Sequence, residues 1–166
     1  ASLTGHLLFT SLHTNSAVGA IARLLDMGME PYLVASSLTA VLAQRLARQV
    51  CPSCKAPYAP GPEVRKQMEE LAARAKVQLP AGSLDRLVMG KGCDKCRRTG
   101  YSGRVLIMEL LPMSQALRGL VLQKASMGEL QKVAESEGMV NLLADGVRKV
   151  LAGRTTLVEV LRVVSV

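Results

Sequence analysis

Four cysteines stand in two C-x-x-C pairs, Cys51-Pro52-Ser53-Cys54 and Cys93-Asp94-Lys95-Cys96. They are the only cysteines of the chain, and 38 residues, Lys55 to Gly92, separate the two pairs. Two thiolates at this spacing can hold one metal ion, and four thiolates suit tetrahedral zinc with bonds of about 2.3 Å. Because four protein ligands leave no open position for chemistry, the sequence predicts a structural zinc site that closes the intervening segment into a loop.

Other uses of these cysteines are disulfides, free thiols, or an iron site of the same geometry, as in rubredoxin-like electron carriers. The first residues show no charged segment followed by an apolar run and a small-residue cleavage site, so nothing indicates an oxidising, secreted environment. In a reducing compartment, paired C-x-x-C spacing favours a metal over disulfides. Elemental analysis separates the two metals, and so does colour, because an iron–thiolate protein is coloured and a zinc protein is not.

The composition indicates a globular protein with a basic surface. Hydrophobic residues make up 49% of the 166, which is ample for a buried core. The 21 basic and 13 acidic residues give a net charge of +8, which four thiolates with one zinc ion would reduce to about +6. Such a surface favours acidic partners such as nucleotides, anionic lipids or nucleic acids. Single-stranded nucleic acid is disfavoured, because the few aromatic side chains form no cluster for base stacking.

The first fifty residues predict one strand and two helices. Leu7–Leu12 is a short apolar run between turn residues, which is typical of a buried strand. A helix is predicted from Asn15 to Met27, with Gly28 as its end. A second helix is predicted from Pro31 to Gln49. Its nearly uncharged part is too short to cross a bilayer, which indicates a core helix. Four residues at helical spacing predict its buried face: Ala35, Leu38, Leu42 and Leu46.

The remaining residues predict an inserted segment, a returning strand and a group of helices. Residues 56–62 hold three prolines and predict a loop, and Glu63–Lys76 predicts a charged helix with one apolar side. Gly103–Leu111 predicts a strand, and helices are expected from Ser114 onward. Two capping boxes and two glycines mark helix starts and ends: Ser126–Glu129, Thr156–Glu159, Gly138 and Gly153.

The sequence contains no complete active site of a recognisable kind. It has no G-x-x-x-x-G-K-[ST], G-x-G-x-x-G or H-E-x-x-H motif. Its two histidines, His6 and His13, flank the apolar run Leu7–Leu12. His13 lies where the predicted strand ends, and ligands of α/β sheets bind outside the carboxyl ends of the strands. From the pattern alone, His13 either reaches a phosphate or only ends the strand and caps the next helix.

The run from Thr4 to Asn15 resembles the histidine box of the ATPases that drive type II secretion and type IV pilus extension. The combination of this box with two cysteine pairs is specific, because the related pilus retraction ATPases generally lack the cysteines. The similarity covers nearly the whole chain outside the insertion, in the order typical of the family, through these motifs: Arg23–Gly28, Ala43–Leu46, Cys51–Cys54, Thr99–Arg104, Glu109–Leu111 and Gly153–Thr156.

The resemblance implies an α/β fold, namely an incomplete RecA-like domain of the P-loop NTPase class with an inserted zinc-knuckle subdomain and a C-terminal helical bundle. Residues 1–50 would be the distal part of the ATPase core, 51–100 the tetracysteine insertion, and 101–166 the returning strand and the bundle. The family's phosphate loop, aspartate box and acidic metal-positioning motif precede the histidine box. The chain therefore looks like a fragment and is expected not to hydrolyse ATP alone.

For the parent protein, the resemblance implies a homo-hexameric ATPase that uses ATP and Mg²⁺. It would be cytoplasmic and peripheral at the inner membrane, working on a platform protein in that membrane and on cytoplasmic domains of the assembly complex. Carried over from the resemblance, His13 is the catalytic candidate that would contact or sense the terminal phosphate. Such a residue can matter without accepting a proton, because phosphoryl transfer depends mainly on positioning and electrostatics. His6, His13 and Arg104 are the nucleotide-binding candidates.

No specific nucleic acid is expected as a partner. The alternative function is a non-enzymatic basic zinc module that contacts nucleic acid, supported by the net charge and the cysteine pairs. It predicts binding that weakens steeply with salt, because phosphate contacts release counterions.

Overall fold

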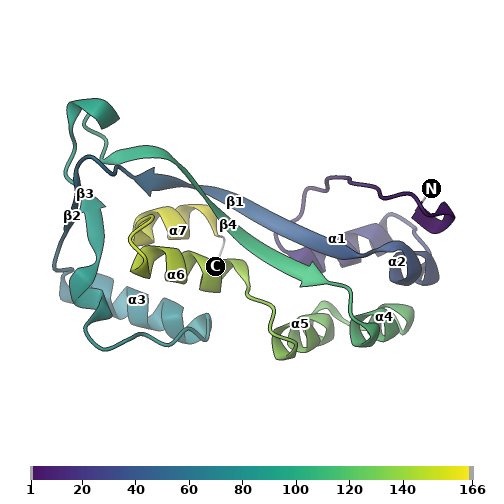
Figure 1. Cartoon of the computed structure of the whole chain (residues 1–166). Coiled ribbons are helices and arrows are strands. Elements are labelled where there is room, and N and C mark those ends of the chain that lie inside the picture. The colour runs from purple at the N-terminus through teal and green to yellow at the C-terminus, as the bar shows by residue number, and fades with distance from the viewer. Residues whose placement is uncertain (1, 165–166) are drawn as a thin grey trace. The chain divides into compact units, whose positions relative to one another are not determined.

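The structure, a computed structural model, describes residues 2–164 and combines helices with strands (Figure 1). The helices are α1 (Ala17–Asp26), α2 (Pro31–Ser37), α3 (Pro62–Arg74), α4 (Gln115–Leu122), α5 (Met127–Ser136), α6 (Leu142–Leu151) and α7 (Leu157–Val163). The strands are β1 (Ala40–Val50), β2 (Lys55–Pro57), β3 (Val88–Gly90) and β4 (Tyr101–Pro112). Short 3-10 turns lie at Ser2–Thr4, Ser83–Arg86 and Asp94–Cys96.

The chain divides into two compact units. The first comprises the residues up to Ala43 together with Glu109–Val140, and the second comprises Gln44–Met108 together with the residues from Asn141 onward. The cysteines, α3, α6 and α7 therefore belong to the second unit. The histidines, α1, α2, α4 and α5 belong to the first.

The strands β1 and β4 pair in a two-stranded sheet and run in opposite directions (Figure 1). In the first unit, the Met113 N–H donates to the Thr39 carbonyl oxygen at 2.9 Å. In the second unit, the Cys51 N–H donates to the Gly100 carbonyl oxygen at 2.9 Å. The predicted strand Gly103–Leu111 is confirmed as the central part of β4.

The predicted helix Pro31–Gln49 is wrong beyond Ser37, where α2 ends and β1 soon begins. Leu42 and Leu46, expected on a buried helix face, are 52% and 50% exposed, whereas Ala43 and Ala47 are buried. Burial in β1 alternates between successive residues, as it does in a strand with one buried face. Pairing with β4 satisfies the backbone of β1 and overrides the helical spacing of its leucines.

The predicted strand Leu7–Leu12 is also wrong, because residues 6–14 have no regular secondary structure. Leu7, Leu8 and Phe9 are 77%, 59% and 90% exposed. A strand needs a neighbour that accepts and donates its backbone hydrogen bonds. Within residues 2–164 no strand pairs with this run, so its apolar side chains do not contribute to a core.

Buried polar contacts hold the start of α1 in the first unit. The helix is capped by Ser16, one residue after the expected Asn15, and the Ser16 hydroxyl oxygen accepts from the Gly19 N–H at 3.0 Å. Glu109 on β4 is only 3% exposed, and its Oε1 accepts from the Ala17 N–H at 2.6 Å. A carboxylate at this position satisfies a backbone donor at the positive end of the helix.

The predicted helices after Ser114 are present, and the Ser126–Glu129 capping box is confirmed in both directions. The Thr156–Glu159 box forms only in part: the Thr156 hydroxyl oxygen accepts from the Glu159 N–H, but the Glu159 carboxylate binds elsewhere. In the second unit, α3 confirms the charged helix predicted at Glu63–Lys76 and packs against α6. None of the described helices combines the length and the apolar character that a membrane span requires.

Candidate metal centre and polar cluster

The structure brings the four cysteines together, as the sequence predicts. Cys51 follows the end of β1, and Cys54 precedes β2. Cys93 precedes the short 3-10 turn Asp94–Cys96 after β3, and Cys96 is the last residue of that turn. Their Sγ atoms all lie within 4.8 Å of one another. None of the four forms a disulfide. Cys51 and Cys96 are buried, which shields the centre of the cluster from water.

The spacing of the sulfur atoms fits a tetrahedral metal ion. With bonds of about 2.3 Å, the edge of a regular zinc–sulfur tetrahedron measures about 3.8 Å. The Sγ atoms of Cys51 and Cys93 are 3.9 Å apart, those of Cys54 and Cys96 are 3.8 Å apart, and those of Cys93 and Cys96 are 3.7 Å apart. The described residues therefore form a ligand set that a zinc ion would fill with little movement.

Backbone hydrogen bonds hold the two cysteine turns. The Cys93 N–H donates to the Sγ of Cys96 at 3.2 Å, and the Lys91 N–H donates to the Cys54 carbonyl oxygen at 3.1 Å. Antiparallel pairing of β2 with β3 places Lys55 opposite Gly90 and so aligns the residues that adjoin both turns. The segment 55–57 is thus a short strand where the sequence predicts a loop from residue 56.

The thiols of this cluster differ in their acidity. Burial among the other cysteines raises the pKa of Cys54 to about 12. A backbone hydrogen bond from Cys93 lowers the pKa of Cys96 to about 6. Four thiolates would repel one another without a cation, whereas a bound divalent metal favours the thiolate form and releases protons.

Two glycines let the backbone segments beside the cysteines approach each other. A Cβ atom at Gly90 would lie 2.0 Å from the carbonyl oxygen of Gly100, and one at Gly100 would lie 2.6 Å from the carbonyl oxygen of Gly90. Gly100 also has a φ of +77°, which glycine adopts without strain. The contact is therefore available to glycine at both positions.

Gly90→Ala should force the β3 end away from Gly100 and destabilise the second unit by about 2 kcal/mol, a typical cost of overpacking. Chemical denaturation of the metal-loaded protein measures this loss. Gly119→Ala is a matched control, because nothing lies within 4 Å of its added Cβ and alanine favours the α4 helix. Equal stability of the Gly90→Ala variant and the natural chain would show that the two segments do not need this close contact.

The two histidines predicted to contact nucleotide lie outside helices and strands. His6 and His13 are exposed in the first unit, and the His6 Nδ1 lies 3.1 Å from the Thr4 hydroxyl oxygen. Arg104 is exposed on β4 in the second unit. The roles of His6, His13 and Arg104 therefore remain predictions.

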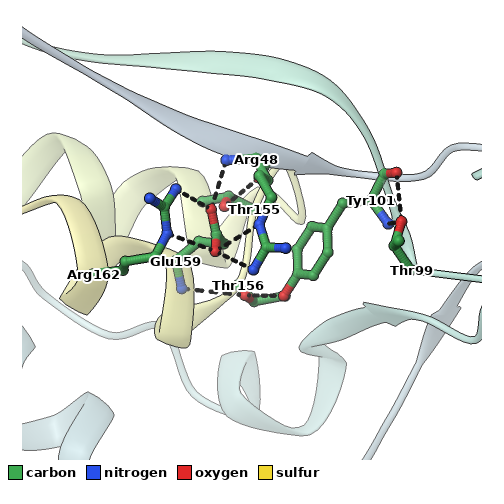
Figure 2. A network of polar contacts seen from close by, with 7 residues as sticks. All are labelled: Arg48, Thr99, Tyr101, Thr155, Thr156, Glu159 and Arg162. Atoms are coloured by element: carbon green, nitrogen blue, oxygen red, sulfur yellow. Dashed lines mark hydrogen bonds and ion pairs between the residues drawn. The ribbon is translucent and has the colours of Figure 1, made fainter.

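A buried carboxylate that the sequence assigned only to helix capping forms the second polar site (Figure 2). The side chain of Glu159 on α7 has no exposed surface, and two arginines bind it. The Nε and Nη2 atoms of Arg48 donate to its Oε1 at 2.9 and 2.7 Å, and the Arg48 backbone N–H donates to its Oε2 at 2.7 Å. Arg162 donates from its Nε at 3.0 Å and from its Nη2 at 2.7 Å.

Further contacts in the same unit fix the position of Arg48. Its guanidinium carbon lies 4.3 Å from the centre of the Tyr101 ring, an arrangement that favours a cation. The Tyr101 hydroxyl lies 2.9 Å from the Thr156 hydroxyl oxygen, and the buried Thr155 hydroxyl donates to the Arg48 carbonyl oxygen at 2.8 Å. The cluster therefore joins β1, β4 and the start of α7 (Figure 2).

Glu159 stays ionised although it is buried. Burial alone would raise the pKa of its carboxyl group, but the hydrogen bonds from Arg162 and Arg48 outweigh that effect and lower the pKa to about 2. A free glutamate has a pKa of about 4.3. Folding therefore favours the ionised form, and this contribution is fully present above about pH 4.3.

The stabilisation that Glu159 provides should disappear as the pH falls from about 4 to about 2. Acid also protonates the cysteines, which lowers the stability of the protein by a separate route. The test therefore compares the chain with a Glu159→Gln variant, because both proteins lose the cysteine contribution equally. Urea unfolding at several pH values should show a constant difference in unfolding free energy between about pH 5 and pH 7, and a shrinking difference below about pH 4. A difference that stays constant down to about pH 2.5 would contradict the assignment of the low pKa to Glu159.

Comparison with known proteins places the sequence of this chain in a family. The family model described as Type II/IV secretion system protein matches residues 1–162. The chain is 45% identical to Type II secretion system protein E of Pseudomonas aeruginosa and 44% identical to Type II secretion system ATPase E of Vibrio cholerae, in each case over 98% of its length. It is 43% identical to the Type IV pilus assembly ATPase PilB of Myxococcus xanthus over 96% of its length.

The chain spans less than a third of the length of these relatives. It covers 30% of the Pseudomonas aeruginosa and Vibrio cholerae proteins and 27% of the Myxococcus xanthus protein. The activities of these relatives therefore belong to proteins that are more than three times as long as these 166 residues.

Proposed function

Because this chain belongs to the Type II/IV secretion system protein family, we propose that it is the C-terminal portion of a secretion or pilus-assembly ATPase. The complete protein would assemble as a homo-hexamer and convert the hydrolysis of ATP, with Mg²⁺, into mechanical work. The work would act on a platform protein of the inner membrane together with cytoplasmic domains of the assembly complex. The ATPase would be cytoplasmic and peripheral to that membrane.

The observation that carries this proposal is the similarity over nearly the whole chain to relatives named as type II secretion and type IV pilus ATPases. The clustered cysteines add a physical feature that the sequence resemblance predicts. In this proposal, residues 1–50 belong to the ATPase core, 51–100 to the metal-binding insertion, and 101–166 to the returning strand and the helical bundle.

The metal of the insertion is proposed to be structural zinc. Cys51, Cys54, Cys93 and Cys96 would hold it, and a zinc ion with four thiolate ligands supplies rigidity but no open coordination position. Three of the six sulfur–sulfur distances are 3.7 to 3.9 Å, and all six lie within 4.8 Å, which supports this assignment. Elemental analysis of the purified chain should give one zinc per molecule and a colourless solution, whereas iron would give a coloured one.

His13 is proposed to contact or sense the terminal phosphate of ATP in the complete protein, with His6 and Arg104 as further nucleotide contacts. Imidazole and guanidinium N–H groups can locate a phosphate without accepting a proton, which suits a reaction dominated by positioning. In the complete protein, His13→Ala should therefore lower ATP turnover far more than nucleotide affinity. Lys132→Ala, an exposed residue of the first unit outside the run Thr4–Asn15, provides the control.

A chimera tests the proposed function directly. The segment of the Pseudomonas aeruginosa type II secretion protein that matches this chain is replaced by residues 1–163, and secretion is measured in a strain that lacks the native protein. The chimera should restore secretion if this chain does the work of the segment to which it is 45% identical. The same chimera with Cys51→Ser should not.

The two chimeras have to accumulate to the same level for this comparison. A folded, zinc-containing chimera that hydrolyses ATP but exports nothing would support a role of this chain in ATP hydrolysis and contradict its role in secretion. A folded chimera that does not hydrolyse ATP would contradict the proposed function. The alternative of a nucleic-acid-binding zinc module gains no support from the relatives, whose names concern secretion and pilus assembly.

A further inference from the structure

Three arginines from three different elements line one hollow in the second unit. The hollow has a volume of about 600 Å³ and is lined by Leu46, Ala47, Arg48, Arg104 and Arg162. Arg48 comes from β1, Arg104 from β4 and Arg162 from α7. This volume falls within the range of small-molecule sites in proteins. We call it the arginine hollow.

Two of the three guanidinium groups are held in place on one side only. Arg48 and Arg162 both bind the buried carboxylate of Glu159, yet each of their side chains is 51% exposed. Both arginines use Nε and Nη2 for Glu159, and neither Nη1 has a partner among residues 2–164. Since each guanidinium group carries five N–H donors, the outward donors are available and already oriented.

Arg104 supplies the third charge of the arginine hollow. Among the residues that the structure describes, no carboxylate or carbonyl group binds its guanidinium. Three guanidinium groups and one carboxylate leave the arginine hollow with two positive charges in excess. A group with several oxygen acceptors and a matching negative charge would satisfy these donors.

The charge of the arginine hollow favours phosphate over carboxylate. A phosphate monoester carries a charge of about −1.5 to −2 near neutral pH and offers three acceptor oxygens. A single carboxylate would leave one positive charge uncompensated. The half-exposed Leu46 adds an apolar wall for the organic part of such a ligand.

We propose that the arginine hollow binds a phosphoryl group, with Arg104 as a direct contact and Glu159 as the residue that positions Arg48 and Arg162. The ligand would be a small phosphate ester or free phosphate. The inference rests on the proposed function for Arg104, which is there a nucleotide contact, and deepens it by adding Arg48, Arg162 and Glu159 to the same site. Phosphate binding is measured on the isolated chain, so its failure is distinct from a failure of ATP turnover or secretion in the complete protein.

Titration of the zinc-loaded chain with inorganic phosphate, glycerol 3-phosphate and AMP tests this site, with glycerol and adenosine as neutral controls. Calorimetry gives the affinities, and the NMR signals of the arginine Nε–H groups report which side chains respond. All three phosphates should bind and shift the signals of Arg48 and Arg162, and the neutral compounds should not. The compound that binds most tightly indicates the source of the phosphoryl group: glycerol 3-phosphate stands for a lipid headgroup, AMP for a nucleotide and inorganic phosphate for the free ion.

Arg104→Gln should weaken phosphate binding by about tenfold, as expected for loss of a charged hydrogen bond, without disturbing the fold. Arg97→Gln removes the same charge from an exposed position outside the arginine hollow and should change the affinity less than twofold, as expected for a screened distant charge. An equal loss of phosphate affinity in the two variants would show that phosphate is attracted only by the overall positive charge of the surface, which would overturn the proposal. Equally tight binding of acetate at the same residues would overturn it in favour of an acidic protein side chain.

A Glu159→Gln variant tests whether Glu159 affects phosphate binding by positioning Arg48 and Arg162 or only through its negative charge. The substitution removes a negative charge, so it should tighten phosphate binding if Glu159 acted through its charge alone. A positioning role predicts weaker binding and broadened Nε–H signals of Arg48 and Arg162, because the amide keeps only one acceptor oxygen and turns an NH2 group toward arginine donors. Tighter binding would remove Glu159 from the proposal, and if this variant does not fold, the Arg104→Gln result alone decides the site.

Discussion

Cys51→Ser should abolish stoichiometric zinc binding and destabilise the second unit by more than about 4 kcal/mol, the range reached when a structural metal is lost. Cys51 is 1% exposed and lies 3.9 Å, sulfur to sulfur, from Cys93, so no water molecule can easily take its place as a ligand. Thermal unfolding followed by circular dichroism, together with elemental analysis, measures both effects.

Ser53→Ala is the control for the cysteine variant, because Ser53 lies between the two cysteines of the first pair and is exposed. It should retain zinc and unfold at the temperature of the natural chain. A strong chelator should reproduce the effect of Cys51→Ser in the natural chain and have none in the variant. Unchanged unfolding after complete metal removal would contradict a structural role of the centre.

Glu159→Ala should destabilise the second unit by about 3 kcal/mol, the lower end of the cost of breaking a buried ion pair. The variant leaves the Arg48 backbone N–H without its acceptor, removes the shared acceptor of two guanidinium groups and opens a cavity beside α7. Urea unfolding at neutral pH measures the loss, and hydrogen exchange should show early opening of α7.

A glutamate on the surface supplies the matched control. Glu69→Ala in α3 removes the same charge from an exposed position, so its effect should stay within about 0.5 kcal/mol. A second comparison uses Arg162→Lys, which keeps the charge but loses the forked donor geometry. If Glu159→Ala were as stable as Glu69→Ala, the contacts drawn in Figure 2 would not stabilise the fold.

Local patterns predicted the cysteine cluster and much of the helical part. C-x-x-C spacing requires no knowledge of distant contacts, and the chain does bring the two pairs together. The charged helix α3 and the Ser126 capping box also depend on residues within a few positions of one another. Such features are encoded over short stretches, where propensity and spacing act directly.

Contacts between residues far apart in the sequence explain why two secondary-structure predictions were wrong and why one polar cluster was missed. The leucines of β1 repeat at helical spacing, but pairing with β4, about sixty residues later, decides the outcome. Leu7–Leu12 has the composition of a buried strand, yet within the described residues it has no partner strand. The Glu159 cluster was missed because its arginines lie 111 residues before and three residues after it, and the Thr156–Glu159 spacing already suggested a capping role.

The 38 residues between the cysteine pairs have a consequence for biogenesis. During synthesis, the first pair leaves the ribosome before α3 exists, and it can offer an ion only two sulfurs. Full coordination becomes possible after Cys96 emerges, and it then ties both ends of a folded segment in one step, which restricts the unfolded chain as a crosslink would. With the zinc proposed for these cysteines, the zinc supply during translation should therefore govern how much newly made protein escapes degradation.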